Sequence, residues 1–101
     1  MRLHVTAFLA CMSASTGAKA MLSADFLDRF NDQERAAYAG GIVDSMAYGF
    51  AAAKQESKAV CVNNWFYRGQ GPQQLASVLQ AHRDLPVPGV LQVLVKRLCG
   101  E

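Results

Sequence analysis

The stretch NDQERAAYAGGIVDSMAYGFAAAKQES, residues 31–57, decides the fold of this chain of 101 residues. It opens on Asn31 and Glu34, which have the spacing of a capping box, in which each side chain accepts a hydrogen bond from the other residue's backbone N–H. Apolar and small residues then recur at spacings of three and four. They form one helical stripe, Ala36, Gly40, Val43, Ala47 and Phe50, widened by Tyr38, Ile42 and Met46. The stretch therefore predicts a central helix over 32–57 with one buried face.

Glycines inside this predicted helix indicate close packing. Gly40, Gly41 and Gly49 would each destabilise a helix interior by up to about 1 kcal/mol relative to alanine. Residues without a side chain are useful where two helices approach closely. We therefore expect another helix to lie against the central one at these positions.

Three shorter helices are predicted around the central one. Ser23 caps the first, which ends near Asn31; Pro72 opens the second, which ends before Pro86; and the third follows Pro88. Their apolar faces are Phe26, Leu27 and Phe30 in the first, Leu75, Val78 and Leu79 with His82 beside them in the second, and Val90, Leu91, Leu94, Val95 and Leu98 in the third. The helical period is lost over residues 60–71, which predicts an ordered loop or a short extended segment. The fold class is all-α, a small four-helix bundle.

The composition is that of one globular domain. Hydrophobic residues make up 51% of the chain and charged residues 18%, which is unlike a disordered protein. The formal net charge of +2 is too small for a dedicated nucleic-acid binder, which gathers lysines and arginines on one face. We expect no nucleic-acid partner.

The first 20 residues have the pattern of a signal peptide. Arg2 supplies the positive start, residues 3–12 are largely apolar, and Ala18-Lys19-Ala20 places small residues at both positions that a signal peptidase recognises. We expect cleavage after Ala20, which divides the chain into a signal peptide over 1–20 and a domain over 21–101. The mature protein would then be periplasmic and free of the membrane. The alternatives are an ordinary N-terminal helix and a lipoprotein anchored through Cys11.

Cleavage would leave Cys61 and Cys99 as the only thiols and His82 as the only histidine. An even pair of cysteines in an oxidising compartment predicts a disulfide. Such a bridge would stabilise the fold by on the order of 4 kcal/mol in the chain-entropy model. Two alternatives use the same residues: a Cys61 nucleophile with His82 as its base, or a zinc site formed by Cys61, Cys99 and His82. Both lack further partners, so we expect no catalytic residue, no cofactor and no metal.

Three carboxylates and one glycine-rich segment are also candidates for chemistry. Asp25 and Asp28 lie three residues apart on one exposed helix edge, where they favour the positive end of the helix. Asp44 lies beside the central stripe, where a partly buried structural hydrogen bond is expected. The segment 69–71, Gly-Gln-Gly, follows no strand and is expected to be a turn.

Residues 63–68, NNWFYR, contain more large aromatic and polar side chains than packing of a short loop requires. Trp, Tyr and Arg dominate binding hot spots. If the segment is extended, Trp65 and Tyr67 share one side and Phe66 faces the other. The candidate partner-binding residues are Asn64, Trp65, Tyr67 and Arg68. The alternative is that Trp65 and Phe66 plug the bundle beside the disulfide.

The order and spacing of these features resemble a known family. A signal peptide, the segment YAGGIVD over 38–44, Cys61, the segment GPQQL over 71–75 and a final apolar helix ending in Cys99 resemble the small periplasmic immunity proteins of the Tai family, which neutralise type VI secretion amidase effectors. The resemblance implies a helical bundle with a disulfide and no catalysis of its own. It also implies a peptidoglycan amidase as partner, whose active-site cleft the protein covers.

The chain departs from the family pattern at two places near its end. His82-Arg83-Asp84 stands where a His-Pro-Glu-like turn is expected, and Leu98 replaces the proline before the last cysteine. The alternative function is that of a small periplasmic acid-stress chaperone similar to HdeA, which also combines a few helices with one disulfide. A homodimer is a further alternative, which the sequence alone does not decide.

Overall fold

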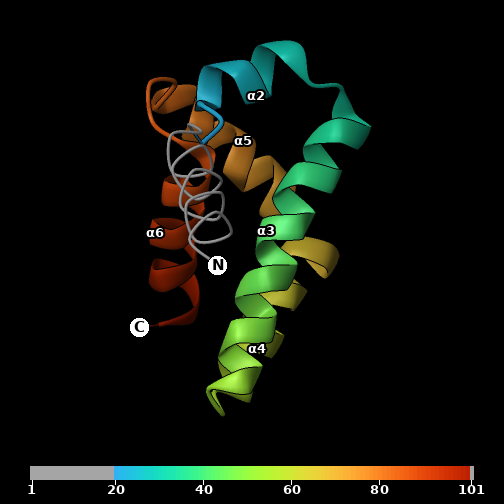
Figure 1. Ribbon diagram of the computed structural model, residues 1–101, viewed down its shortest axis with the longest axis vertical. Helices are drawn as coiled ribbons and strands as arrows, with labels where there is room; N and C mark the ends of the chain where they lie inside the picture. The colour runs from blue at the N-terminus through green and yellow to red at the C-terminus, as the bar shows by residue number, and fades with distance from the viewer. Residues whose placement is uncertain (1–19, 101) are drawn as a thin grey trace, which may run out of the picture.

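Helices connected by short turns make up the chain in this computed structural model, which describes residues 20–100. Figure 1 shows them in order, and their bounds are α2 (Ser23–Arg29), α3 (Asp32–Ala52), α4 (Glu56–Asn63), the π-helical turn η1 (Asn64–Arg68), α5 (Gly71–Ala81) and α6 (Val87–Cys99). The all-α prediction is confirmed, but the described residues form five α-helices and a π turn instead of four helices. No helix among them is long and apolar enough to cross a membrane. The predicted signal peptide lies outside the described residues, except for Ala20.

The central helix α3 begins as predicted and ends early. The Glu34 N–H donates to Asn31 Oδ1 at 2.8 Å and the Asn31 N–H donates to Glu34 Oε1 at 3.0 Å, so the capping box is confirmed. The helix ends at Ala52 rather than near Ser57, and Lys54 follows in the left-handed region with φ of 61°. The apolar stripe stops at Phe50, so the polar residues beyond it have no buried face to hold them in the helix.

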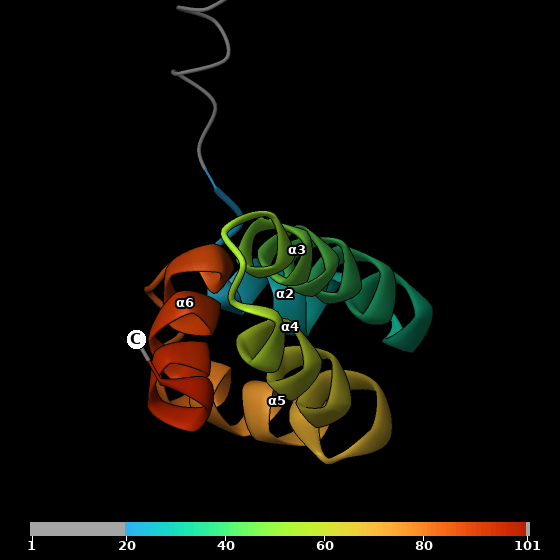
Figure 2. The same cartoon turned by 90° about the horizontal axis from the view of Figure 1, so that it is seen from below.

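The predicted loop over 60–71 is wrong, because most of it is helical. After the turn at Lys54 the chain folds back, and α4 lies along the C-terminal half of α3 (Figures 1 and 2). Ala59, Val62 and Phe66 are buried against the core, at spacings that suit one face of a helix. Packing of this face outweighs the weak helix preference of the β-branched residues.

The short helix α2 is held differently from the prediction. Ser23 is not its cap but its first helical residue, and it is fully buried. Its hydroxyl donates to the Leu85 carbonyl at 2.7 Å and its N–H donates to the same carbonyl at 2.9 Å. The Val87 N–H donates to the Met21 carbonyl at 2.9 Å. These bonds join the start of the described chain to the turn between α5 and α6.

The last two helices contribute most of the large buried side chains. Pro72 stands in the first turn of α5, as predicted, while α6 begins at Val87, slightly earlier than predicted. Two predicted apolar positions are wrong: His82 is exposed and Leu98 is 44% exposed. The buried hydrophobic core consists of Phe26, Ala39, Val43, Ala47, Ala59, Val62, Phe66, Leu75, Leu79, Val87, Val90, Leu91 and Val95.

The predicted disulfide is confirmed. Cys61 and Cys99 are bridged with an S–S distance of 2.04 Å, and their Cα atoms lie 5.8 Å apart. The bridge joins α4 to the last residue of α6, across a sequence separation of 38 residues. It therefore holds the end of the described chain beside the segment that leads into η1.

Candidate functional site

The segment NWFYR, predicted to be an ordered loop or a short extended segment, forms the π-helical turn η1. π-helices are rare and occur frequently at functional sites. Phe66 is buried at 5% exposure, and its ring meets the Tyr67 ring edge-on, with centroids 5.0 Å apart. The predicted alternation is therefore wrong, because Trp65 and Tyr67 reach different helices instead of sharing one side.

Tyr67 projects from η1 toward α3 and stays 56% exposed. Its hydroxyl donates to Asp44 Oδ1 at 2.7 Å. This hydrogen bond to the carboxylate, with a little burial and the negative charge of Asp44, raises the pKa of Tyr67. Asp44 makes the predicted structural hydrogen bond, but it is exposed and not partly buried. The pair fixes a phenol at the molecular surface.

Trp65 points toward α5 instead. Its indole N–H donates to Gln74 Oε1, and the side chain is half-buried against the core. Both residues therefore pack against the core, as the alternative interpretation predicts, with Phe66 buried and Trp65 half-buried. The exposed side of the turn consists of Asn64, Tyr67 and Arg68, and we call these three residues the η1 surface.

Two glycines allow η1 to sit where it does. A Cβ at Gly71 would lie 2.7 Å from both Phe66 Cα and the Trp65 carbonyl oxygen, which is closer than real Cβ contacts. A Cβ at Gly40 would lie 3.1 Å from the Tyr67 hydroxyl and 3.7 Å from the Phe66 ring. The expected close approach is therefore confirmed at Gly40, though its neighbour is η1. It is wrong at Gly41 and Gly49, where an added Cβ would meet nothing within 4 Å.

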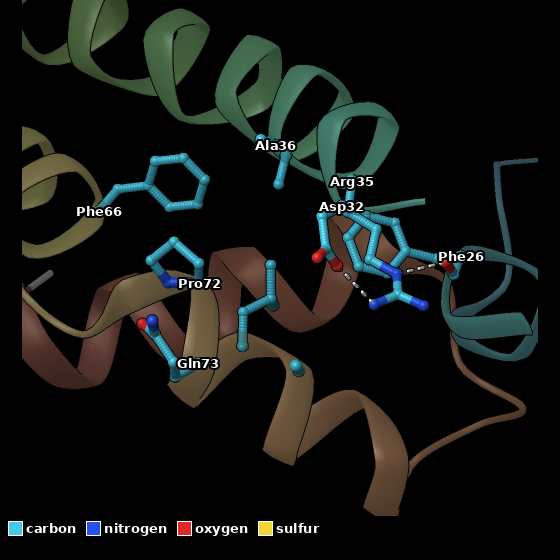
Figure 3. Close-up of a pocket in the computed structure, with 10 residues that line it drawn as sticks. Phe26, Asp32, Arg35, Ala36, Phe66, Pro72 and Gln73 are labelled. Carbon is cyan, nitrogen blue, oxygen red and sulfur yellow. Dashed lines mark hydrogen bonds and ion pairs between the residues drawn. The ribbon is translucent and has the colours of Figure 1, made fainter. Parts of the chain in front are cut away.

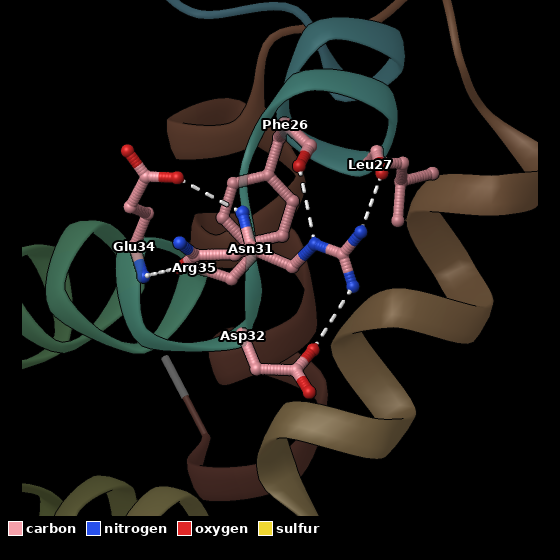
Figure 4. A network of polar contacts seen from close by, with 6 residues as sticks. All are labelled: Phe26, Leu27, Asn31, Asp32, Glu34 and Arg35. Carbon is pink, nitrogen blue, oxygen red and sulfur yellow. Dashed lines mark hydrogen bonds and ion pairs between the residues drawn. The ribbon is translucent and has the colours of Figure 1, made fainter.

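A polar network that the sequence analysis missed fixes the corner between α2 and α3 (Figure 4). Arg35 donates from Nε to the Phe26 carbonyl at 3.3 Å and from Nη2 to the Leu27 carbonyl at 2.5 Å. It also pairs with Asp32 at 3.4 Å. These bonds satisfy carbonyls at the end of α2 that lack helical partners. The basic side chain so close to the capping box was the only sequence signal.

A pocket of about 330 Å³ opens beside this network (Figure 3). Phe26, Phe66 and Leu75 form part of its apolar lining, and Asp32 and Arg35 stand at one side. Among residues 20–100, the charged groups in the lining are Asp32 and Arg35, which pair with each other. The described part of the pocket therefore offers mainly apolar surface beside one ion pair.

The disulfide overturns the two chemical alternatives that needed thiols. Both sulfur atoms are bonded to each other, so Cys61 is no nucleophile and neither cysteine serves as a zinc ligand. Within residues 20–100, no group of three or more His, Cys, Asp or Glu side chains is placed to hold a metal ion. Asp25 and Asp28 form separate ion pairs, with Arg29 and Arg83 respectively. They are therefore arranged as surface carboxylates and not as an acid and base pair.

A scan against protein-family models, a search of curated proteins and a search of solved structures each found no match to this chain.

Proposed function

We propose that this chain is a periplasmic immunity protein that inhibits a peptidoglycan amidase effector of a type VI secretion system by covering its active site. The observation that carries the proposal is the η1 surface, where Asn64, Tyr67 and Arg68 are exposed on one π turn. Tyrosine and arginine are enriched in the centres of protein interfaces. The likeness of the sequence pattern to the Tai family suggests the class of partner.

The η1 surface suits binding because it is held before any partner arrives. Phe66 anchors the turn in the core, Asp44 holds the Tyr67 hydroxyl, and the bridge at Cys61 fixes the preceding helix. A surface that is already ordered loses less conformational entropy on association. Arg68 adds five N–H donors in a planar fork, which match carboxylates and backbone carbonyls around a cleft.

Export to the periplasm rests on residues 1–20 and on the cysteine pair. The signal-peptide pattern supports export, and disulfides persist in oxidising compartments such as the periplasm. A peptidoglycan amidase acts in the same compartment as the proposed mature protein. The proposed roles and location are thus consistent with each other.

The experiment first asks whether a neighbouring gene encodes an exported peptidoglycan amidase, and then combines that enzyme with residues 21–101 of this chain. We expect the two to co-elute and the amidase to stop releasing fragments from purified peptidoglycan at equimolar inhibitor. Continued digestion at saturating inhibitor would overturn the proposal. If digestion continues, and the chain unfolds at about pH 2–3 and then keeps a client protein soluble, an HdeA-like chaperone function would replace the immunity function.

A further inference from the structure

A groove of about 400 Å³ lies between α3 and α6, and it shares no residue with the η1 surface. Met46 and Phe50 from α3 and Val95 from α6 provide its apolar lining, and Lys96 and Gln92 are its polar members. Volumes of this size fall within the usual range of small-molecule sites, which combine an apolar lining with a few polar groups.

Gly49 helps to keep this groove open. It lines the groove from α3, and a Cβ built on it would meet nothing within 4 Å. No close packing within the described chain therefore requires glycine here, although glycine destabilises a helix interior by about 1 kcal/mol relative to alanine. The groove is therefore open on the side of Gly49.

The charged side chains that the structure describes around the groove are positive. Lys96 lines it, and Lys58 Nζ lies 6.0 Å from the centroid of the Phe50 ring, within the range of a cation–π contact. The ion pairs among residues 20–100 use Arg29, Arg35 and Arg83 and leave both lysines without a carboxylate partner. Among residues 20–100, no acidic side chain lines the groove. An apolar lining beside unpaired ammonium groups complements an alkyl chain that ends in an anion.

We propose that the groove between α3 and α6 binds a free single-chain anionic amphiphile, a medium-chain fatty carboxylate. The alkyl chain lies on Met46, Phe50 and Val95, and the carboxylate meets Lys96 and Lys58. Hydrogen bonds between charged groups stabilise such a complex more than neutral ones do. The inference does not depend on amidase inhibition, because the two sites have no residue in common.

The first test titrates the mature protein by isothermal calorimetry with sodium decanoate below its micellar concentration. Decyltrimethylammonium, which has an equally long chain and a positive head, is the matched ligand. We expect decanoate to bind at least about tenfold more tightly, and Lys96→Gln to weaken decanoate binding by a similar factor. The matched variant Arg97→Gln, next in sequence on α6 and outside this groove, should leave the affinity unchanged.

The second test fills the groove from Gly49. Gly49→Leu should abolish decanoate binding while helicity and melting temperature are kept or raised, because the new side chain enters open space. Gly41→Leu, also open on α3 but outside the groove, should bind decanoate normally. Equal affinity for the two amphiphiles, normal binding by folded Gly49→Leu, or binding only to anionic phospholipid vesicles would each overturn the proposal.

Discussion

At Gly71 the backbone of α5 comes so close to η1 that even one methyl group has no space. A Cβ there would lie 2.7 Å from Phe66 Cα and from the Trp65 carbonyl oxygen, and both are backbone atoms that cannot swing aside. We predict that Gly71→Ala lowers the free energy of unfolding by about 1–3 kcal/mol, the usual cost of overpacking.

Denaturant titration measures this effect, and Gly41→Ala is its control. Gly41 lies in α3 with nothing near its missing side chain, so alanine should raise the free energy of unfolding by about 0.5–1 kcal/mol. Equal stabilisation by both substitutions would show that η1 and α5 do not meet as closely as described.

The phenol of Tyr67 gives a pH dependence whose sign follows from its hydrogen bond to Asp44. Only the neutral phenol donates to the carboxylate, so the folded pKa of Tyr67 lies above its ordinary value of about 10. The bond therefore contributes stability that is fully present below about pH 10 and is lost as the pH rises through the raised pKa.

Nuclear magnetic resonance of tyrosine labelled at Cζ can follow this titration residue by residue. We predict that Tyr67 titrates above its ordinary range in the wild type and shifts down in Asp44→Asn, which removes the negative charge but keeps the shape. A Tyr67 titration that Asp44→Asn leaves unmoved would contradict the assigned cause.

Among the elements, α4 and α6 depend most on a covalent link. The bridge from Cys61 to Cys99 closes a long loop and so restricts the unfolded chain. We predict that the double variant Cys61→Ser with Cys99→Ser loses roughly 2–5 kcal/mol of stability. Urea unfolding of oxidised and reduced wild type, with the variant alongside, measures the loss; identical midpoints would show that packing alone holds these helices.

Helical periodicity predicted the elements with a clear apolar stripe and failed where the stripe is short. The capping box and the stripe from Ala36 to Phe50 predicted α3, although Ala36 itself is exposed. Leu75 with Leu79 predicted α5. The segment of α4 and η1 was missed because Cys61, Val60 and Trp65 have weak helix preference, and only packing of Val62 and Phe66 on other helices settles its conformation.

For the whole molecule, the export hypothesis predicts where the mature chain begins. Among residues 20–100, the first backbone hydrogen bond involves Met21, whose carbonyl accepts from the Val87 N–H, and cleavage after Ala20 would keep this bond. We predict that intact-mass analysis of periplasm-derived protein finds a chain starting at Met21. A mass that retains residues 2–20 would contradict export and the oxidised state that accompanies it.

The candidate site could be located from the sequence but not oriented. Contiguous Trp65, Phe66, Tyr67 and Arg68 marked the segment because these residue types favour interfaces. Which side chains stay exposed depends on partners far away in the sequence, since Trp65 donates a hydrogen bond to Gln74 and Tyr67 donates one to Asp44. The pairing of Cys61 with Cys99 was predictable because the proposed mature chain has no other thiols.

The affinity of Arg68→Ala for the candidate amidase tests most directly whether the η1 surface covers that enzyme. Trp65→Ala is unsuitable because its side chain also packs on the core. We predict that Arg68→Ala binds at least about thirtyfold more weakly than wild type, with unchanged circular dichroism. Arg97 is also exposed, and Arg97→Ala should stay within about twofold of wild type. Wild-type affinity of a folded Arg68→Ala protein would contradict η1 as the binding surface.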